Sequence, residues 1–388
     1  MRYKLKNIFD LEMGKTPSRS SKVYWNKKDY KWISIADLTK TGKYISETKE
    51  YISEQAVKEC KIKIIPANTV VMSFKLSIGK TAITAEDMYS NEAVMAFHDK
   101  HVIDFLPEYI FYMFKYKNWY EGSNKAVMGK TLNKATLSEI EIDVCPVEKQ
   151  RIIVNNLDKI MSVLESRENE LILLDDLIKA RFVEMFGNPD VNEYNWGIYK
   201  MEELCDIGSS KRIYQNEQSR IGIPFLRISD LVNRMETGSK ESDLYIPESR
   251  FEELKKQGLV PKSGDILLTA RGTLGRCYII QDDDEFYFQD GMITWLSKYD
   301  AKVIPLYISY LFEMPGFRKQ IDSLQAGSTV AYLSIYMTKK LDIMLPPIEL
   351  QNQFADFVKQ VDKSKVAVKK ALEETQLLFD SLMQQYFG

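Results

Sequence analysis

Two short turns in this chain combine cationic side chains with glycine and hydroxyl residues, a mixture suited to binding phosphate groups or the edges of bases. The turns occupy residues 75–80 (KLSIGK) and 271–276 (RGTLGR). Glycine lets a backbone approach a phosphate closely, a hydroxyl donates or accepts a hydrogen bond, and lysine or arginine neutralises phosphate or contacts guanine. Plain hairpin turns with solvated charges can look the same, so the repetition carries more weight than either turn alone. The candidate binding residues are Lys75, Ser77, Gly79, Lys80, Arg271, Thr273, Gly275 and Arg276.

Two further pairs of loops share this chemistry at matching places in the two halves of the sequence. The early loops, residues 14–19 and 209–212, each follow the first expected strand of their half. The late loops are residues 129–131 and 327–329. Each loop is a weak signal by itself, but the matched positions favour a shared binding role. The candidates in these loops are Lys15, Thr16, Ser18, Arg19, Lys130, Thr131, Lys211, Arg212, Ser328 and Thr329.

Three Gly-Lys-Thr tripeptides, which begin at Gly14, Gly79 and Gly129, resemble part of a nucleotide-binding phosphate loop. That loop also needs a glycine five residues earlier, so that backbone amides can wrap around the phosphates. We therefore expect no ATP or GTP site of this type. The three earlier positions hold Phe9, Phe74 and Asn124.

Other catalytic motifs are missing from the sequence as well. It contains neither a methyltransferase Asn/Asp-Pro-Pro-aromatic element nor a Gly-x-Ser-x-Gly elbow, and its only histidines are His98 and His101. Without nearby cysteines this histidine pair is more typical of a strand end than of a metal site. The carboxylate run at residues 282–285 could belong to a nuclease, but a solvated turn is the more common form of such a run. We expect no catalytic residue, metal or cofactor in this chain.

The sequence contains an internal repeat, because segments of its first half recur in its second half. The segment CPVEKQRII at residues 145–153 matches PPIELQNQF at residues 346–354, and Met-Phe-Gly at 185–187 matches Tyr-Phe-Gly at 386–388. Such internal repetition decides the architecture before any single motif does. Between the matched ends, both copies have apolar residues three and four apart, no internal proline and a terminal glycine, which predicts one long helix each.

The apolar seam of each predicted helix keeps the 3.5-residue spacing of a coiled coil. Polar residues interrupt it at Arg167 and Arg181 in the first helix and at Lys365 and Thr375 in the second. Because these interruptions do not coincide, we expect the two helices to pair with each other, although each could instead lie on its own domain. The expected pairing residues are Ile153, Leu157, Ile160, Leu164, Leu171, Leu174, Ile178, Phe354, Val358, Val361, Leu372, Phe379 and Leu382.

Shorter blocks repeat before each helix, for example WISIADL at residues 32–38 with FLRISDL at 225–231, and SNEAVMAF at 90–97 with FQDGMITW at 288–295. Their β-branched and aromatic residues and their turn punctuation predict strands. The fold class is therefore α+β: two similar mixed domains separated by two long helices in an antiparallel coiled coil. The expected parts are a first domain at 1–145, a helix at 146–188, a second domain at 189–345 and a helix at 346–388.

Composition agrees with a folded, multidomain protein. The 388 residues exceed one typical core, and 45% apolar with 28% charged residues is an ordinary globular balance. No apolar run is long enough to span a membrane, so a cytoplasmic location is expected. The net charge of −2 does not indicate nucleic acid. Basic residues exceed acidic ones only in residues 1–145, so any DNA-facing charge must be local.

These repeated blocks resemble the specificity subunits of type I restriction-modification systems over essentially the full chain. The resemblance rests on an ISDL-like strand end, an IPKGDILLT-like strand before a Ser/Thr-x-Gly turn, and the helix entries CPVEKQ and LPPIELQ. The set occurs twice and in order, with a long helix after each copy. Departures are Cys145 and Val147, where the family favours Pro and Leu, and the acidic second half.

The resemblance implies two target-recognition domains, each reading one half of a split site in double-stranded DNA. Helices of about 39 residues, roughly 58 Å long at 1.5 Å per residue, would hold them apart. It further implies two methyltransferase subunits bound to this non-catalytic chain, joined by translocase-nuclease subunits. S-adenosylmethionine, ATP and Mg would belong to those partners. A rival interpretation is a paired-helix scaffold whose globular ends bind proteins instead of DNA.

Overall fold

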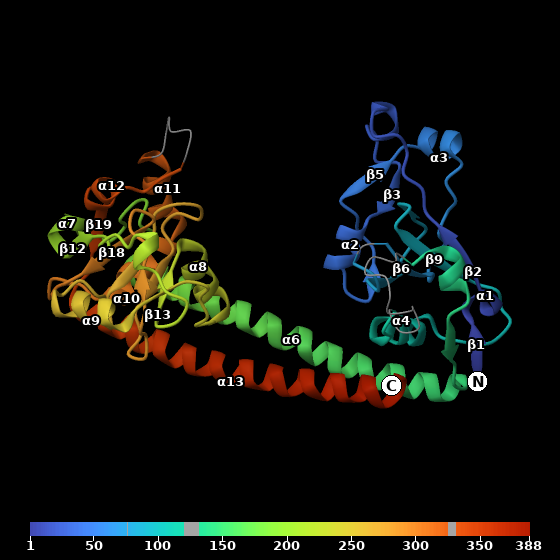
Figure 1. Ribbon diagram of the computed structural model, residues 1–388. Helices are drawn as coiled ribbons and strands as arrows, with labels where there is room; N and C mark the ends of the chain where they lie inside the picture. Colours follow the sequence, from blue (N-terminus) through green and yellow to red (C-terminus); the bar gives the residue numbers. More distant parts are fainter. Residues whose placement is uncertain (76, 120–131, 325–330) are drawn as a thin grey trace. The chain divides into compact units, whose positions relative to one another are not determined.

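The computed structural model describes residues 1–75, 77–119, 132–324 and 331–388, which form two compact units. Unit one contains Met1–Glu168 and Lys370–Gly388, and unit two contains Asn169–Lys369. Each unit therefore holds one globular domain together with parts of both long helices. These helices are α6 (Val147–Phe186) and α13 (Ile348–Phe387), of 40 residues each (Figure 1).

Unit one is built on a five-stranded sheet of order β2-β9-β6-β7-β4 and a three-stranded sheet of order β5-β3-β8. Helix α4 (Pro107–Tyr116) packs against β6 and β7 (Figure 1). Within the second sheet, β3 and β8 run parallel, so their carboxyl ends meet at one edge. The strands are β1 (Arg2–Lys4), β2 (Phe9–Met13), β3 (Tyr30–Ile33), β4 (Tyr44–Ile45), β5 (Glu50–Ile52), β6 (Val70–Ser73), β7 (Thr81–Thr84), β8 (Tyr89–Ser90), β9 (Val94–Asp99) and β10 (Glu141–Asp143). The other helices are α1 (Leu5–Ile8), α2 (Ile35–Lys40), α3 (Glu54–Cys60) and α5 (Lys134–Ser138).

Unit two repeats this plan. Its sheets have the orders β12-β18-β15-β16 and β14-β13-β17, and β13 and β17 again run parallel. The strands are β11 (Gly197–Lys200), β12 (Asp206–Gly208), β13 (Ile223–Leu226), β14 (Tyr245–Ile246), β15 (Ile266–Thr269), β16 (Cys277–Ile279), β17 (Tyr287–Phe288), β18 (Ile293–Ser297) and β19 (Asp342–Leu345). The helices are α7 (Met201–Leu204), α8 (Ile228–Thr237), α9 (Glu248–Lys256), α10 (Pro305–Glu313), α11 (Pro315–Leu324) and α12 (Ile335–Lys339). The predicted pair of similar mixed domains is confirmed.

The central strand of each unit is buried on both faces. In β6, Val70 and Met72 belong to the core beneath α4, whereas Val71 belongs to a second core toward β3. In β15, Ile266 and Leu267 divide between two cores in the same way. Because successive side chains of a strand point to opposite faces, a strand between two cores needs a continuous apolar run. The repeated VVMS and ILLT segments supply it.

The long helices pack against each other inside each unit. In unit one, the side-chain amide of Asn156 in α6 donates to the hydroxyl of Tyr386 in α13 at 3.1 Å. In unit two, the rings of Phe182 and Phe354 lie 5.5 Å apart, while Asp175 of α6 pairs with Lys365 of α13. From Asp175 to Phe182 along α6, the contacted residue of α13 changes from Lys365 to Phe354. The two helices therefore run antiparallel within unit two.

Most of the expected pairing residues are buried or partly buried in the main core of their unit, which contains residues of both long helices and of the globular domain. Leu171 is half-buried, and it is not among the residues packed into the main core of either unit. Two residues absent from the expected seam, Phe182 and Phe186, are completely buried in unit two. The buried members of the expected set are Ile153, Leu157, Leu164, Ile178, Phe354, Val358, Val361 and Phe379, and the partly buried ones are Ile160, Leu174, Leu372 and Leu382.

The polar residues in the second seam have partners. Lys365 donates to the Asp175 carboxylate at 2.6 Å, with only 16% of its side chain exposed. The Thr375 hydroxyl donates to the Ala371 carbonyl oxygen one turn earlier, at 2.7 Å. Such pairing limits the cost of placing polar groups in an apolar seam.

A fully buried glutamine ties the start of each long helix to its domain. Gln351 accepts the Ile304 amide at 3.0 Å and donates to the carbonyl oxygens of Lys302 and Pro346 at 2.9 and 2.8 Å. Gln150 makes the matching set in unit one, with Leu106, Asp104 and Cys145. The glutamine shared by CPVEKQ and LPPIELQ is thus a structural residue.

Among the helices in the described ranges, none has the length and apolar character needed to cross a bilayer.

Candidate nucleic-acid interface

The two glycine-containing turns have the same internal hydrogen bonds. In unit one, the Ser73 hydroxyl donates to the Ser77 carbonyl oxygen at 2.6 Å and accepts the Lys80 amide at 3.0 Å. In unit two, the Thr269 hydroxyl donates to the Thr273 carbonyl oxygen at 2.5 Å and accepts the Arg276 amide at 3.0 Å. A hydroxyl at the end of the preceding strand therefore fixes the shape of both turns.

Glycine is required at the same place in each turn. Gly79 and Gly275 have φ values of 90° and 72°, in the left-handed region that other residues rarely adopt. A Cβ atom on Gly79 would lie 3.1 Å from Cδ1 of Trp119, and one on Gly275 would lie 3.1 Å from Cδ1 of Ile321. Both turns are thus seated on apolar side chains of their own unit.

The cationic side chains of the turns differ in their surroundings. Lys80 and Arg271 are exposed, and the Arg271 guanidinium lies 5.2 Å from the centre of the Tyr332 ring. Lys75 is half-buried. Arg276 donates to the Glu236 carboxylate of α8 at 2.6 Å, so an acidic neighbour holds this predicted DNA-binding residue in the unbound protein.

The early loop of unit one runs against the loop that follows β8. The Lys15 amide donates to the Ser90 carbonyl oxygen at 2.8 Å, and the Thr16 hydroxyl donates to the Glu92 carboxylate. A Cβ atom on Gly14 would lie 2.3 Å from the carbonyl oxygens of Ser90 and Asn91. Residue 14 is therefore a glycine because the two loops approach each other closely, and this packing explains it without a phosphate-binding loop.

Farther along the same loop, Arg19 is held in a fixed position. Its guanidinium donates to both oxygens of the Glu50 carboxylate, at 2.5 and 2.9 Å, and lies 3.9 Å from the Trp25 ring centre. The hydrogen bonds raise the pKa of Arg19 and lower that of Glu50. The Ser18 hydroxyl lies 2.8 Å from that of Ser20. Arg19 is therefore a preoriented cation with a stacked aromatic support.

The early loop of unit two lies against the loop that follows β17. The Ser210 hydroxyl donates to the Phe288 carbonyl oxygen at 2.7 Å, and the Lys211 amide donates to the Tyr287 hydroxyl at 2.8 Å. The Arg212 guanidinium donates to the Asp290 carboxylate at 2.8 Å. The hydrogen bond from Arg212 to Asp290 raises the pKa of this arginine.

A third loop, which the sequence analysis did not select, joins the other two in both units. It occupies residues 90–93 in unit one and 288–292 in unit two. Its backbone binds the residue just before each glycine turn, because the Phe74 amide donates to the Ala93 carbonyl oxygen at 3.0 Å and the Ala270 amide donates to the Met292 carbonyl oxygen at 2.9 Å. The sequence signal that could have identified this loop was the match between SNEAVMAF and FQDGMITW. The early loop, the glycine turn and this third loop together form what we call the three-loop face of each unit.

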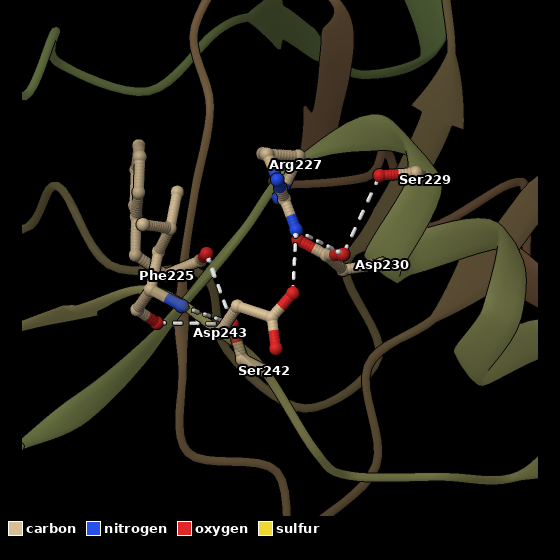
Figure 2. A network of polar contacts seen from close by, with 7 residues as sticks. Phe225, Arg227, Ser229, Asp230, Ser242 and Asp243 are labelled. Atoms are coloured by element: carbon tan, nitrogen blue, oxygen red, sulfur yellow. Dashed lines mark hydrogen bonds and ion pairs between the residues drawn. The ribbon is translucent and has the colours of Figure 1, made fainter. Parts of the chain in front are cut away.

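In unit two, one more arginine lies next to the three-loop face, at the end of β13. Figure 2 shows Arg227 between two carboxylates, donating to Asp230 at 3.0 and 3.1 Å and to Asp243 at 3.3 Å. The main chain places it there, because the Gln289 amide of the third loop donates to the Leu226 carbonyl oxygen at 2.9 Å. Sequence reasoning missed Arg227, although it stands within the repeated FLRISDL block.

Four predicted site residues, Lys130, Thr131, Ser328 and Thr329, lie outside the described residues. Of the remaining candidates, the structure brings the early-loop and turn residues of each unit onto a common face. This face is electrostatically mixed, because Arg19, Arg212 and Arg276 each pair with a carboxylate. Carboxylates therefore offset part of the positive charge of each face.

The described residues contain no metal-ligating cluster, and three carboxylates of the acidic run have hydrogen-bond partners. No group of three or more His, Cys, Asp or Glu side chains in the described part of the chain could hold a metal ion. Burial lowers the pKa of His98, whose Nε2 lies 3.5 Å from a Glu12 oxygen. In the acidic run, Asp282, Asp283 and Asp284 accept hydrogen bonds from Ser263, Lys240 and Arg234, respectively.

Comparison with known proteins agrees with the repeated domain architecture. A family model described as the type I restriction modification DNA specificity domain matches residues 1–174 and again residues 193–376. The MjaIX specificity subunit of Methanocaldococcus jannaschii is 25% identical over 405 residues, which cover 98% of this chain and 90% of that protein. A putative type I specificity subunit of Haemophilus influenzae, S.HindORF215P, is 30% identical over 66% of this chain and 63% of its own length.

Solved structures share the fold. The type I restriction-modification S subunit from M. genitalium aligns with a TM-score of 0.53 and 14% identity, covering all of this chain and 96% of its own. A chain from a structure concerned with complex assembly and conformational transition of the type I restriction-modification system aligns with a TM-score of 0.62 and 14% identity, covering all of this chain and 97% of its own. With the domain matched twice in one sequence, this chain belongs to the family of type I restriction-modification DNA specificity subunits.

Proposed function

We propose that each unit reads one half of a bipartite target in double-stranded DNA, and that the three-loop face is the reading surface. The observation that carries this proposal is the occurrence of the same face in both units, with matching hydrogen bonds between the Ser73 or Thr269 hydroxyl and the main chain of its turn. A single DNA-binding face would serve one contiguous site. Two equivalent faces in one chain are suited to two half-sites.

The chemistry of the face fits recognition of a duplex. Exposed cations such as Lys80 and Arg271 can neutralise phosphates, and the hydroxyls and guanidinium groups beside them can contact base edges. The loops are already held by internal hydrogen bonds, so little conformational entropy is lost when DNA binds. Arg19, stacked on Trp25, is an example of such preorganisation.

The paired helices set the separation of the half-sites and dock the methyltransferase subunits in this proposal. Its support is the apolar surface that α6 exposes in unit two, where Ile172, Leu173 and Leu177 are 59%, 67% and 47% exposed. Exposed apolar patches on soluble proteins commonly mark protein contacts. Two methyltransferase subunits and the translocase-nuclease subunits would complete the complex. S-adenosylmethionine, ATP and Mg would bind to those partners.

The direct test is to select DNA with the assembled complex. The full chain, co-purified with its methyltransferase subunits, is incubated with a library of duplexes containing a random region, and the bound duplexes are sequenced. We expect enrichment of two short motifs separated by a fixed gap. Enrichment of one contiguous motif, or no enrichment over a library incubated with the methyltransferase alone, would contradict the proposal.

A further inference from the structure

We propose that Glu92 and Asp290 are equivalent specificity-determining residues, whose carboxylates select against duplexes that offer no amino hydrogen at the contacted base edge. This inference rests on the proposed function. It assigns a role to two acidic side chains on a face that we propose binds DNA through its cationic residues. Carboxylates repel phosphate, so their presence on both three-loop faces requires a physical explanation.

The two carboxylates occupy the same place in their units. Each stands two residues beyond the end of the second parallel strand, β8 or β17. The residue between is held alike, since the Asn91 amide donates to Ile33 at 3.0 Å and the Gln289 amide donates to Leu226 at 2.9 Å. The repeat therefore preserves an acid at this position in both three-loop faces.

Each carboxylate contacts the early loop of its own unit. Glu92 accepts the Thr16 hydroxyl, and this hydrogen bond lowers the pKa of Glu92, as do the positive charges of Lys75 and Arg19. Asp290 accepts the Arg212 guanidinium at 2.8 Å and is 22% exposed. Glu92 is therefore ionised at neutral pH, and both acids remain accessible beside groups that we expect to approach DNA.

A carboxylate in this position has opposite effects on different duplexes. Affinity for arbitrary DNA comes from phosphate neutralisation by cations, so a neighbouring negative charge weakens it. The same carboxylate forms a favourable hydrogen bond where a base presents an amino group in the major groove, as N4 of cytosine and N6 of adenine do. The carboxylate thus lowers the affinity for every sequence. Its hydrogen bond restores affinity only where a base presents an amino group, so the ratio of specific to non-specific affinity rises.

The competing explanation is that each acid only fixes the early loop. Glu92→Gln and Asp290→Asn separate the two roles, because an amide oxygen still accepts the hydrogen bond from Thr16 or Arg212 but carries no charge. Matched controls make the same change elsewhere in each unit. They are Glu139→Gln, where the carboxylate pairs with Lys4 at 2.9 Å, and Glu202→Gln, where it pairs with Lys340 at 2.7 Å.

The experiment measures binding of the full chain in complex with its methyltransferase to the duplex selected by the wild type and to an unrelated duplex of equal length, over a range of salt concentrations. For each of the two variants we expect tighter binding to the unrelated duplex and a salt dependence steeper by about 0.9 in log-log slope. We also expect the ratio of specific to non-specific affinity to fall by roughly fivefold to 100-fold, with base preference relaxed only in the half-site read by the altered unit.

The outcomes distinguish this inference from the proposed function. If the wild-type complex selects no sequence, the proposed function fails and the inference fails with it. If the wild type selects a bipartite target but Glu92→Gln and Asp290→Asn keep its affinity ratio and base preferences, as the two control variants should, the inference alone is overturned. Unchanged thermal unfolding of the variants verifies that any loss of selectivity is not a loss of folding.

Discussion

Replacing Gln351 by methionine should destabilise unit two strongly, although the change adds no charge and nearly keeps the side-chain length. Gln351 is completely buried at the start of α13, and its amide satisfies three main-chain groups of unit two. Methionine fills a similar volume with flexible apolar atoms, so little packing should be lost. The predicted effect is therefore a measure of the hydrogen bonds alone.

The magnitude follows from the groups left without partners. The variant loses hydrogen bonds to the Ile304 amide and to the carbonyl oxygens of Lys302 and Pro346. A buried group left unsatisfied costs about 1–3 kcal/mol, and a carbonyl can be rescued by water more readily than an amide. We expect the free energy of unfolding of unit two to fall by about 3–5 kcal/mol.

Two measurements on the full chain test this expectation. Urea unfolding gives the change in free energy, and hydrogen exchange followed by mass spectrometry locates it in peptides that contain Ile304. The control is Gln353→Met, an exposed position two residues further along the same helix, which should change stability by less than about 0.5 kcal/mol. A loss below about 1 kcal/mol for Gln351→Met, close to that of the control, would refute the reasoning.

Three further predictions concern the loops and the helices. Gly14→Ala should displace the early loop of unit one, because its Cβ would meet Ser90 and Asn91 backbone oxygens at 2.3 Å, and duplex titrations should show about tenfold weaker binding to that half-site only. Arg271→Ala should reduce the log-log salt slope of binding by about 0.9; an unchanged slope and affinity would exclude a phosphate contact. Leu173→Asp should leave unfolding within about 0.5 kcal/mol of the wild type but abolish co-purification with the methyltransferase; retained co-purification would contradict docking at this surface.

The repetition of the sequence predicted the architecture well for a physical reason. Matching blocks such as CPVEKQ and LPPIELQ encode the same local structure twice, so each copy supports the interpretation of the other. The long helices were readable because apolar spacing and a terminal glycine are local signals. Helix ends were predicted less well: Phe182 and Phe186 follow Ile178 in steps of four, whereas the expected seam continued through Arg181.

The candidate site was predicted less completely because it depends on contacts distant in sequence. The glycine turns could be recognised from Gly79 and Gly275, whose roles are local. The partners of the cations could not, since Arg276 meets Glu236 across 40 residues of chain. The third loop was overlooked because its acids did not match an expectation built on positive charge.

The central claim is that each unit reads its own half of the target, and exchanging one unit's reading domain tests it most directly. Residues 1–145 are replaced by the corresponding domain of another specificity subunit with a known target, and the methylated motif is determined by long-read sequencing in cells that supply the partner subunits. The account predicts that one half of the bipartite motif changes while the other half stays the same. A motif altered in both halves, or in neither, would contradict it.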